Sequence, residues 1–252
     1  MSVCPESIPP KACLFLDFDG TLVDFAPDPQ SVLVTPDLLC LLATLTQRFE
    51  GALALVTGRA LGDVDGLIRP LQLPVAALHG TVRRDAKGTT LIGTNASIGE
   101  FAASSRRIRE HFQYWVDQQP GVMLEDKGLA LALHFRGARS RWTPTRDDLA
   151  ELESILPPEL ELICGALVVE VRCRGDDKGT AVEAFLNEAP FRDRVPIYIG
   201  DDVADARAIE VVERCGGIAI AVGDRIDARF HFPDPSALRH WLTHLAFGRE
   251  SP

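Results

Sequence analysis

The sequence predicts an α/β protein with a Rossmann-like parallel-sheet core that is interrupted by an inserted α/β cap domain. In the first hundred residues, and again after residue 175, apolar strand-like runs alternate with helical patterns. That alternation is typical of a parallel sheet with right-handed crossover helices. The segment between has the order helix, strand, strand, helix, strand, strand. This second pattern predicts a small antiparallel sheet with two helices on one face.

The first part of the core is expected to contain three strands and two helices. The first helix follows Thr35-Pro36-Asp37, because Thr is a good N-cap, Pro suits the first turn, and leucines follow at helical spacing. A shorter helix is expected over Gly62–Arg69. The strands are the apolar runs Ala12–Asp17, Ala52–Thr57 and Val75–His79.

The middle of the chain supplies the inserted domain. Its helices are expected over Ser104–Gln118 and Thr143–Leu156, and its two hairpins over Val122–Asp126 with Leu129–Phe135 and Glu161–Cys164 with Leu167–Arg172. We therefore expect residues 1–102 and 175–252 to form the core and residues 103–174 to form the cap domain.

The end of the chain returns to the style of the core. We expect helices over Asp177–Glu188, Val203–Cys215 and Ser236–Leu245, and strands over Val195–Ile199 and Gly217–Val222. Together with the first part, these elements complete one parallel sheet.

Composition narrows the class of protein. The 252 residues are 46% apolar and 25% charged, as in soluble globular proteins. The formal net charge of −10 argues against broad binding to nucleic acid or to anionic membranes. The six cysteines form no C-x-x-C pair, and we find neither a signal peptide nor an apolar run of membrane-spanning length. We expect a cytoplasmic monomer that acts on a small molecule.

The most informative segment is the apolar run that ends in Asp17 and Asp19 and continues with Gly20 and Thr21. Residues i and i+2 of a strand share a face, so the two carboxylates repel each other unless a cation lies nearby. A hard divalent ion such as Mg2+ prefers carboxylate oxygens. The segment therefore suggests metal-assisted chemistry on a phosphate, although a strand ending in an ordinary polar turn would give the same letters.

Three other segments carry polar groups at expected strand ends or helix starts: Thr57-Gly58-Arg59, Asp176-Asp177-Lys178-Gly179, and Gly200-Asp201-Asp202 with Asp205 further on. Ligands of doubly wound sheets lie outside the carboxyl ends of the strands. Each segment alone is a common turn or helix start. The four segments in this order point to one active site.

The side chains suit phosphoryl transfer. Asp17 can attack phosphorus as a nucleophile, and Asp19 can protonate the leaving oxygen and later accept a proton from water. Thr57 can donate its hydroxyl to a phosphate oxygen, and Lys178 can supply positive charge during the transfer. These four are the expected catalytic residues.

A metal and a substrate complete the expected site. Asp17, Asp201, Asp202 and the main-chain carbonyl of Asp19 are the expected ligands of Mg2+. On the substrate side, we expect contacts from Gly20, Thr21 and Arg59.

These four motifs resemble those of the haloacid dehalogenase-like phosphohydrolases, and the place of the insert resembles the branch of sugar phosphatases with an α/β cap. Four further stretches resemble the trehalose-6-phosphate phosphatase family, namely His79-Gly80, Glu125-Asp126-Lys127-Gly128, His134 with Arg136, and Glu170-Val171-Arg172. The resemblance implies Mg2+-dependent hydrolysis of trehalose 6-phosphate through an aspartyl-phosphate, the final step of trehalose biosynthesis. It also implies that His79, Glu125, Lys127 and Glu170 bind the sugar.

One departure and three alternatives accompany this resemblance. The family usually has Thr-Asp-Glu-Asp shortly after Gly-Asp-Asp, whereas this chain has Val203-Ala204-Asp205-Ala206. The core and cap motifs also resemble those of phosphatases that act on sucrose 6-phosphate or mannosyl-3-phosphoglycerate. Phosphomannomutases share the phosphoryl-transfer chemistry. A sugar-phosphate sensor without activity is an alternative from another class.

Overall fold

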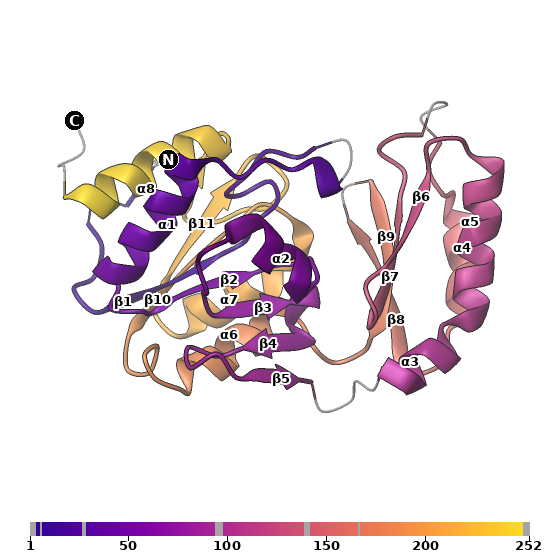
Figure 1. The fold of residues 1–252 in the computed structure, drawn as a ribbon, viewed down its shortest axis with the longest axis horizontal. Coiled ribbons are helices and arrows are strands. Elements are labelled where there is room, and N and C mark those ends of the chain that lie inside the picture. The colour runs from indigo at the N-terminus through magenta and orange to yellow at the C-terminus, as the bar shows by residue number, and fades with distance from the viewer. Residues whose placement is uncertain are drawn as a thin grey trace. The chain divides into compact units, whose positions relative to one another are not determined.

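The computed structural model describes residues 4–5, 7–26, 29–93, 98–138, 142–165 and 167–248. They divide into two compact units, which are described separately (Figure 1). The first contains the described residues of Met1–Ala26, Val32–Leu91 and Asp177–Pro252, and the second those of Pro27–Ser31 and Ile92–Asp176.

An eight-stranded sheet with the order β12-β11-β10-β1-β2-β3-β4-β5 forms the centre of the first unit. Neighbouring strands from β12 to β3 are parallel, and β4 is antiparallel to β3. The strands are β1 (Ala12–Leu16), β2 (Leu53–Val56), β3 (Val75–Ala77), β4 (Val82–Arg84), β5 (Thr90–Ile92), β10 (Val195–Gly200), β11 (Ile218–Val222) and β12 (Phe230–Phe232). The sequence did not predict β4, β5 and β12, which have three residues each.

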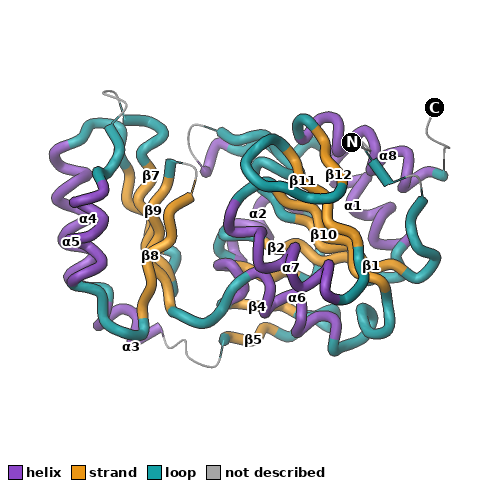
Figure 2. The backbone as a smooth tube through the Cα atoms, turned by 180° about the vertical axis from the view of Figure 1, so that it is seen from behind, coloured by secondary structure: helices purple, strands orange, loops and turns teal. Residues whose placement is uncertain are grey.

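Helices pack on both faces of this sheet, because the buried strands are apolar on both sides. Leu14 and Leu16 of β1 belong to one hydrophobic cluster, and Cys13 and Phe15 belong to another. The first cluster includes residues of α1 (Pro36–Arg48), α2 (Leu61–Ile68) and α8 (Pro235–Phe247), and the second includes residues of α6 (Lys178–Leu186) and α7 (Ala206–Arg214). The predicted parallel-sheet core is confirmed (Figures 1 and 2).

The second unit contains a four-stranded antiparallel sheet with the order β6-β7-β9-β8. Its strands are β6 (Met123–Asp126), β7 (Ala130–His134), β8 (Leu160–Gly165) and β9 (Val168–Cys173), and its helices are α3 (Ile98–Ser104), α4 (Arg106–Gln118) and α5 (Arg146–Ser154). Helices α4 and α5 lie along one face of the sheet (Figure 1). Leu131 and Leu133 alternate with small alanines, Val169 and Val171 alternate with Glu170 and Arg172, and all four of these apolar residues are buried. The predicted antiparallel cap sheet is confirmed.

Some element bounds differ from the predictions for local reasons. The strand expected to reach His79 ends at Ala77, because Leu78 and His79 adopt left-handed backbone angles (φ 48° and 57°) and begin the short 3-10 helix η2 (Leu78–Gly80). The helix expected from Val203 begins as the 3-10 turn η3 (Val203–Asp205), and α7 follows it.

The division between units also lies earlier than the expected boundary at residue 102. Helix α3 contacts α4, so this segment joins the second unit.

None of the helices in the described ranges combines the length and the apolar character needed to cross a bilayer. A third 3-10 turn, η1, covers Pro29–Ser31.

Candidate active site

The expected catalytic groups of the first unit meet where β1 and β10 end. These strands are parallel neighbours with Leu16 opposite Ile199, and the Asp17 amide donates to the Ile199 carbonyl at 2.9 Å. Asp17 is therefore next to the turn that starts at Gly200. The parallel register brings together two motifs that lie far apart in the sequence.

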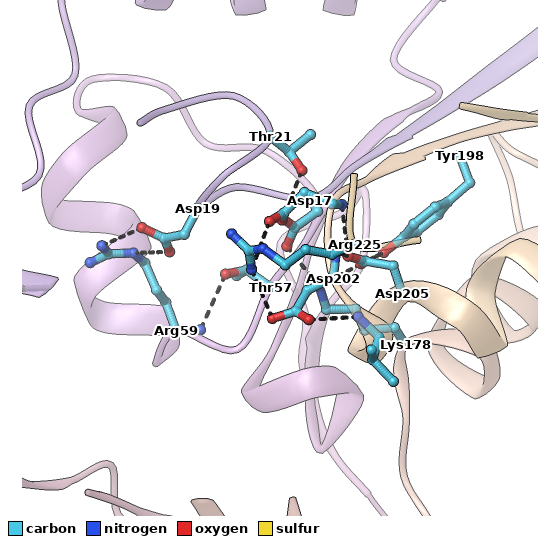
Figure 3. Close-up of polar contacts among 12 residues, drawn as sticks. Asp17, Asp19, Thr21, Thr57, Arg59, Lys178, Tyr198, Asp202, Asp205 and Arg225 are labelled. Atoms are coloured by element: carbon cyan, nitrogen blue, oxygen red, sulfur yellow. Dashed lines mark hydrogen bonds and ion pairs between the residues drawn. The ribbon is translucent and has the colours of Figure 1, made fainter. Parts of the chain in front are cut away.

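Lys178 enters this cluster from the first turn of α6. Asp177 is the N-cap and accepts a hydrogen bond from the Thr180 amide, which fixes where the helix begins. The Lys178 Nζ atom lies 2.7 Å from Asp17 Oδ1 and 2.6 Å from Asp205 Oδ1 (Figure 3). Burial would lower the pKa of Lys178, but the two carboxylates outweigh it and raise the pKa. The ammonium group therefore stays charged.

Asp205 organises the site through both of its carboxylate oxygens. Oδ1 accepts from Lys178 and, at 2.5 Å, from the hydroxyl of the buried Tyr198. Oδ2 accepts from the amides of Asp201 and Asp202 at 3.1 and 3.0 Å. Because both oxygens are engaged, Asp205 fixes Lys178 and the Gly-Asp-Asp turn and is poorly placed to ligate a metal directly.

Asp201 has a hydrogen bond at one carboxylate oxygen and an ion pair with Arg225 at the other. Thr21 Oγ1 donates to Asp201 Oδ1 at 3.3 Å, whereas Oδ2 is buried and accepts no hydrogen bond among the described residues. Burial and the charges of Asp17 and Asp205 raise the pKa of Asp201 to about 9. Gly20 allows this close approach, since a Cβ atom there would lie 2.3 Å from Asp201 Oδ2 and its φ is +83°.

The charges of this cluster fit a divalent cation. One carboxylate oxygen from each of Asp17, Asp201 and Asp205 lies within 4.8 Å of the other two. Three ionised carboxylates around the buried Lys178 ammonium would leave an excess of two negative charges, which the partly exposed Arg225, 3.3 Å from Asp201 Oδ2, offsets only in part. Burial and the charge of Asp205 raise the pKa of Asp17 to about 6, although Lys178 opposes the change. Oxygen donors with this excess charge suit Mg2+.

Asp19 is held away from this cluster by Arg59. The guanidinium donates to both carboxylate oxygens of Asp19, at 2.6 and 2.7 Å, and lies over the Phe18 ring. The backbone amide of Arg59 also donates to Thr57 Oγ1 at 3.2 Å. The Thr-Gly-Arg turn therefore positions the expected acid-base residue, while Thr57 itself is buried beside it.

Asp202 lies at the edge of the cluster. Its Oδ1 caps η3 by accepting from the Val203 amide at 2.7 Å, and its Oδ2 lies 3.3 Å from Arg225 Nη1. Arg225 is also 3.3 Å from Asp201 Oδ2. That Asp19 and Asp202 contribute to metal binding stays a prediction.

His79 belongs to the first unit and packs against the same Thr-Gly-Arg turn. A Cβ atom on Gly58 would lie 2.4 Å from His79 Nε2, so the imidazole needs the glycine. The His79 amide donates to the Thr57 carbonyl at 2.9 Å. Its expected contact with the sugar stays a prediction.

The expected sugar-binding residues of the second unit gather on one face of its sheet. Glu125 of β6 and Glu170 of β9 both pair with Ala132 of β7, so all three share a face. Lys127 Nζ donates to Glu170 at 2.6 Å, and His134 lies 2.7 Å from Glu125. Burial would raise the pKa of Glu125, but the bond to His134 and the charge of Lys127 lower it.

Comparison with known proteins identifies the family of this chain. The family model described as trehalose-phosphatase matches residues 15–229. This chain belongs to the trehalose-phosphatase family. The trehalose-6-phosphate phosphatase of Escherichia coli is 38% identical over 217 residues, which cover 84% of this chain and 78% of that protein.

Solved structures agree with the membership in the trehalose-phosphatase family. A trehalose-6-phosphate phosphatase related protein has a TM-score of 0.76 and 28% identity, and the match covers 93% of this chain and 96% of that one. A haloalkanoate (HAD) superfamily phosphatase from Bacteroides thetaiotaomicron, with TM-score 0.61, 20% identity and coverage of 93% and 94%, shares the fold. The predicted resemblance to both families is confirmed.

Three residues of the site were not assigned a role from the sequence. Asp205 stands three positions after Asp202, a spacing that a capping box would explain, but its bond to Lys178 has no local signal. Tyr198 is a single hydroxyl in an apolar strand. Arg225 carries no sequence motif and is recognised only from its contacts.

Proposed function

We propose that this phosphatase hydrolyses trehalose 6-phosphate to trehalose and inorganic phosphate, with Mg2+ as its cofactor. The observation that carries the chemistry is the buried cluster in which Lys178 bridges Asp17 and Asp205 beside Asp201. The substrate is supported by the names of the relatives, including a trehalose-6-phosphate phosphatase at 38% identity.

The protein residues would divide the reaction into two displacements. A carboxylate oxygen of Asp17 forms a bond to phosphorus while the bond from phosphorus to the sugar oxygen breaks, and Asp19 gives its proton to that oxygen. Water then attacks the aspartyl-phosphate, transfers a proton to Asp19 and frees Asp17. Lys178 and the Thr57 hydroxyl hold the phosphoryl oxygens as charge moves.

The pair between Asp19 and Arg59 must open during this cycle. The Arg59 guanidinium occupies both carboxylate oxygens of Asp19, whereas the first displacement needs one of these oxygens to reach the leaving sugar oxygen. Arg59 therefore keeps Asp19 oriented between turnovers, and it is a candidate contact for the substrate with Gly20 and Thr21.

The metal would be held by Asp17, Asp201, Asp202 and the main-chain carbonyl of Asp19. When bound, Mg2+ supplies positive charge that offsets the excess of carboxylates and polarises the phosphoryl group. The buried Asp201 Oδ2, which accepts no hydrogen bond from the described residues, is the observation that best supports this placement.

The cap would select the sugar. Glu125 and Glu170 can accept hydrogen bonds from sugar hydroxyls and Lys127 can donate to them, with His79 of the core as a further contact. We assign the first unit, expected over residues 1–102 and 175–252, to a catalytic core, and the second unit, expected over residues 103–174 but beginning earlier, to a cap that closes over the substrate. A cytoplasmic monomer that acts on a sugar phosphate completes the proposal.

A phosphate-release screen tests the function. Trehalose 6-phosphate, sucrose 6-phosphate, glucose 6-phosphate and mannose phosphates are each compared with and without Mg2+. We expect the highest kcat/KM for trehalose 6-phosphate and no appreciable rate without divalent cation. Preference for another sugar would overturn the substrate, and no release from any of them would favour a sensor.

A further inference from the structure

Arg225 faces the same carboxylates that we assign to Mg2+. We propose that Arg225 is a positioning residue that sets the affinity of the site for Mg2+, by placing its guanidinium against Asp201 and Asp202 as an internal cation. This inference rests on the proposed function, because it needs the divalent ion to bind at Asp201.

The contacts place one nitrogen between two carboxylates. Arg225 Nη1 lies 3.3 Å from Asp201 Oδ2 and 3.3 Å from Asp202 Oδ2. The first of these oxygens is buried and receives no hydrogen bond from the part of the chain that the structure describes. Arg225 therefore offers charge to Asp201 without a directed hydrogen bond to this residue.

An aromatic ring keeps the guanidinium in this position. The Arg225 Cζ atom lies 4.6 Å from the centroid of Phe25, and a Cβ on Gly20 would lie 2.6 Å from the same ring. The Phe25 ring therefore contacts both the Gly20 turn and the Arg225 guanidinium. A guanidinium stacked on a partly exposed ring can move along it when another cation enters.

Two cations at one carboxylate repel each other. With Mg2+ bound to Asp201, a guanidinium 3.3 Å from the same buried carboxylate would oppose the charge of the metal ion. Arg225 must then either retreat or weaken metal binding, and both cost affinity. Removing its charge should tighten Mg2+ binding by about tenfold.

A second arginine close to Arg225 in the sequence offers a matched control. Arg229 is four positions further, its Cζ atom lies 5.1 Å from the Phe230 ring, and it forms no ion pair among the described residues. Arg229→Gln therefore removes the same charge and the same kind of ring contact without touching a site carboxylate. Arg225→Lys keeps the charge at residue 225 and reports on the shape of the guanidinium.

Titration calorimetry with Mg2+ alone tests the inference on the full chain. We expect the dissociation constant to fall about tenfold in Arg225→Gln, to stay within twofold in Arg229→Gln, and to fall less in Arg225→Lys than in Arg225→Gln. Equal or weaker binding by Arg225→Gln would overturn the role of Arg225 alone. No binding of Mg2+ by either wild type or Arg225→Gln would overturn it together with the proposed cofactor.

Discussion

The two polar clusters of this protein differ in how their charges are balanced. In the core, Asp17, Asp201 and Asp205 outnumber Lys178, and burial raises the pKa of Asp17 and Asp201. In the cap sheet, Lys127 pairs with Glu170 and His134 with Glu125. The core cluster therefore has more carboxylates than basic groups, while each carboxylate of the cap cluster has a basic partner.

This difference separates chemistry from recognition. A site with excess buried negative charge gains by taking up a cation and a phosphoryl group, which fits the proposed attack of Asp17 on phosphorus. A site of paired charges has only hydrogen-bonding capacity to offer, which suits neutral hydroxyls. Changes in the core should therefore alter turnover and metal binding, and changes in the cap should alter substrate affinity.

The largest expected effect is that of Asp17→Asn, which should lower kcat at least on the order of 10³-fold, because the amide is a poor nucleophile. Phosphate release from trehalose 6-phosphate at saturating Mg2+ measures it. Asp24→Asn serves as the control. This variant removes an exposed carboxylate whose ion-pair partner among the described residues is Arg239. Turnover by Asp17→Asn within tenfold of the wild-type value would contradict the nucleophile assignment.

The cap side of the comparison is tested by Glu125→Gln. Loss of a charged acceptor for a sugar hydroxyl should raise KM for trehalose 6-phosphate by about 10-fold, with kcat changed less than about threefold. Activity towards p-nitrophenyl phosphate should stay the same, since that compound has no sugar for the cap to bind.

Glu161→Gln is the matched control for this change. Glu161 lies on the same face of the cap sheet and pairs with Arg172 at 3.0 Å, but it lies outside the proposed sugar contacts. An equal rise of KM in both variants would show that charge on the sheet matters in general. It would contradict a specific role for Glu125.

Asp201→Asn should stabilise the protein when divalent cations are removed. The pKa of Asp201 is raised to about 9 in the folded state, so its ionisation opposes folding increasingly as pH rises from about 4 to about 9. The variant has no such cost. At pH 8 with EDTA we expect its Tm to exceed that of wild type by about 2–8 °C, and at pH 5 by much less.

Thermal unfolding in EDTA and in Mg2+ provides the readout. Mg2+ should raise the Tm of wild type more than that of Asp201→Asn, because binding to the folded state alone stabilises it. Asp24→Asn is the control, since Asp24 is exposed, pairs with Arg239 and lies outside the proposed metal site. A difference in Tm between wild type and Asp201→Asn that changed with neither pH nor Mg2+ would contradict the excess charge at Asp201.

Most of the strands, and the meeting of Asp17 with Lys178, could be predicted because their signals are local. Asp17 follows an apolar run, and Lys178 follows Asp177, whose side chain caps the helix as its type suggests. The cap sheet could be predicted from two hairpins with turns at Gly128 and Gly165. Such short patterns depend on residues that are close in sequence, and the structure contains the elements that they predicted.

The rest depended on contacts between distant segments. Arg59 was expected near the substrate, but its pairing with Asp19 follows from how β1 and β2 lie side by side. The position of Arg225 depends on Phe25, which is on another loop. No periodicity encodes such pairs, because they are created by the sheet order.

The smallest expected effect is that of Tyr198→Phe, and it tests how far the order of the core cluster extends from the reacting atoms. The Tyr198 hydroxyl donates to Asp205 Oδ1, the oxygen that also holds Lys178, so its loss leaves Lys178 paired but less firmly placed. We expect kcat to fall by about three- to tenfold, with KM unchanged, because Lys178 acts on charge that develops during the transfer. Asp205→Asn should lower kcat further, since it removes the charge that fixes the ammonium. If Tyr198→Phe changed KM and left kcat intact, the hydroxyl would serve substrate binding, and the chain from Tyr198 through Asp205 to Lys178 would not order the reaction.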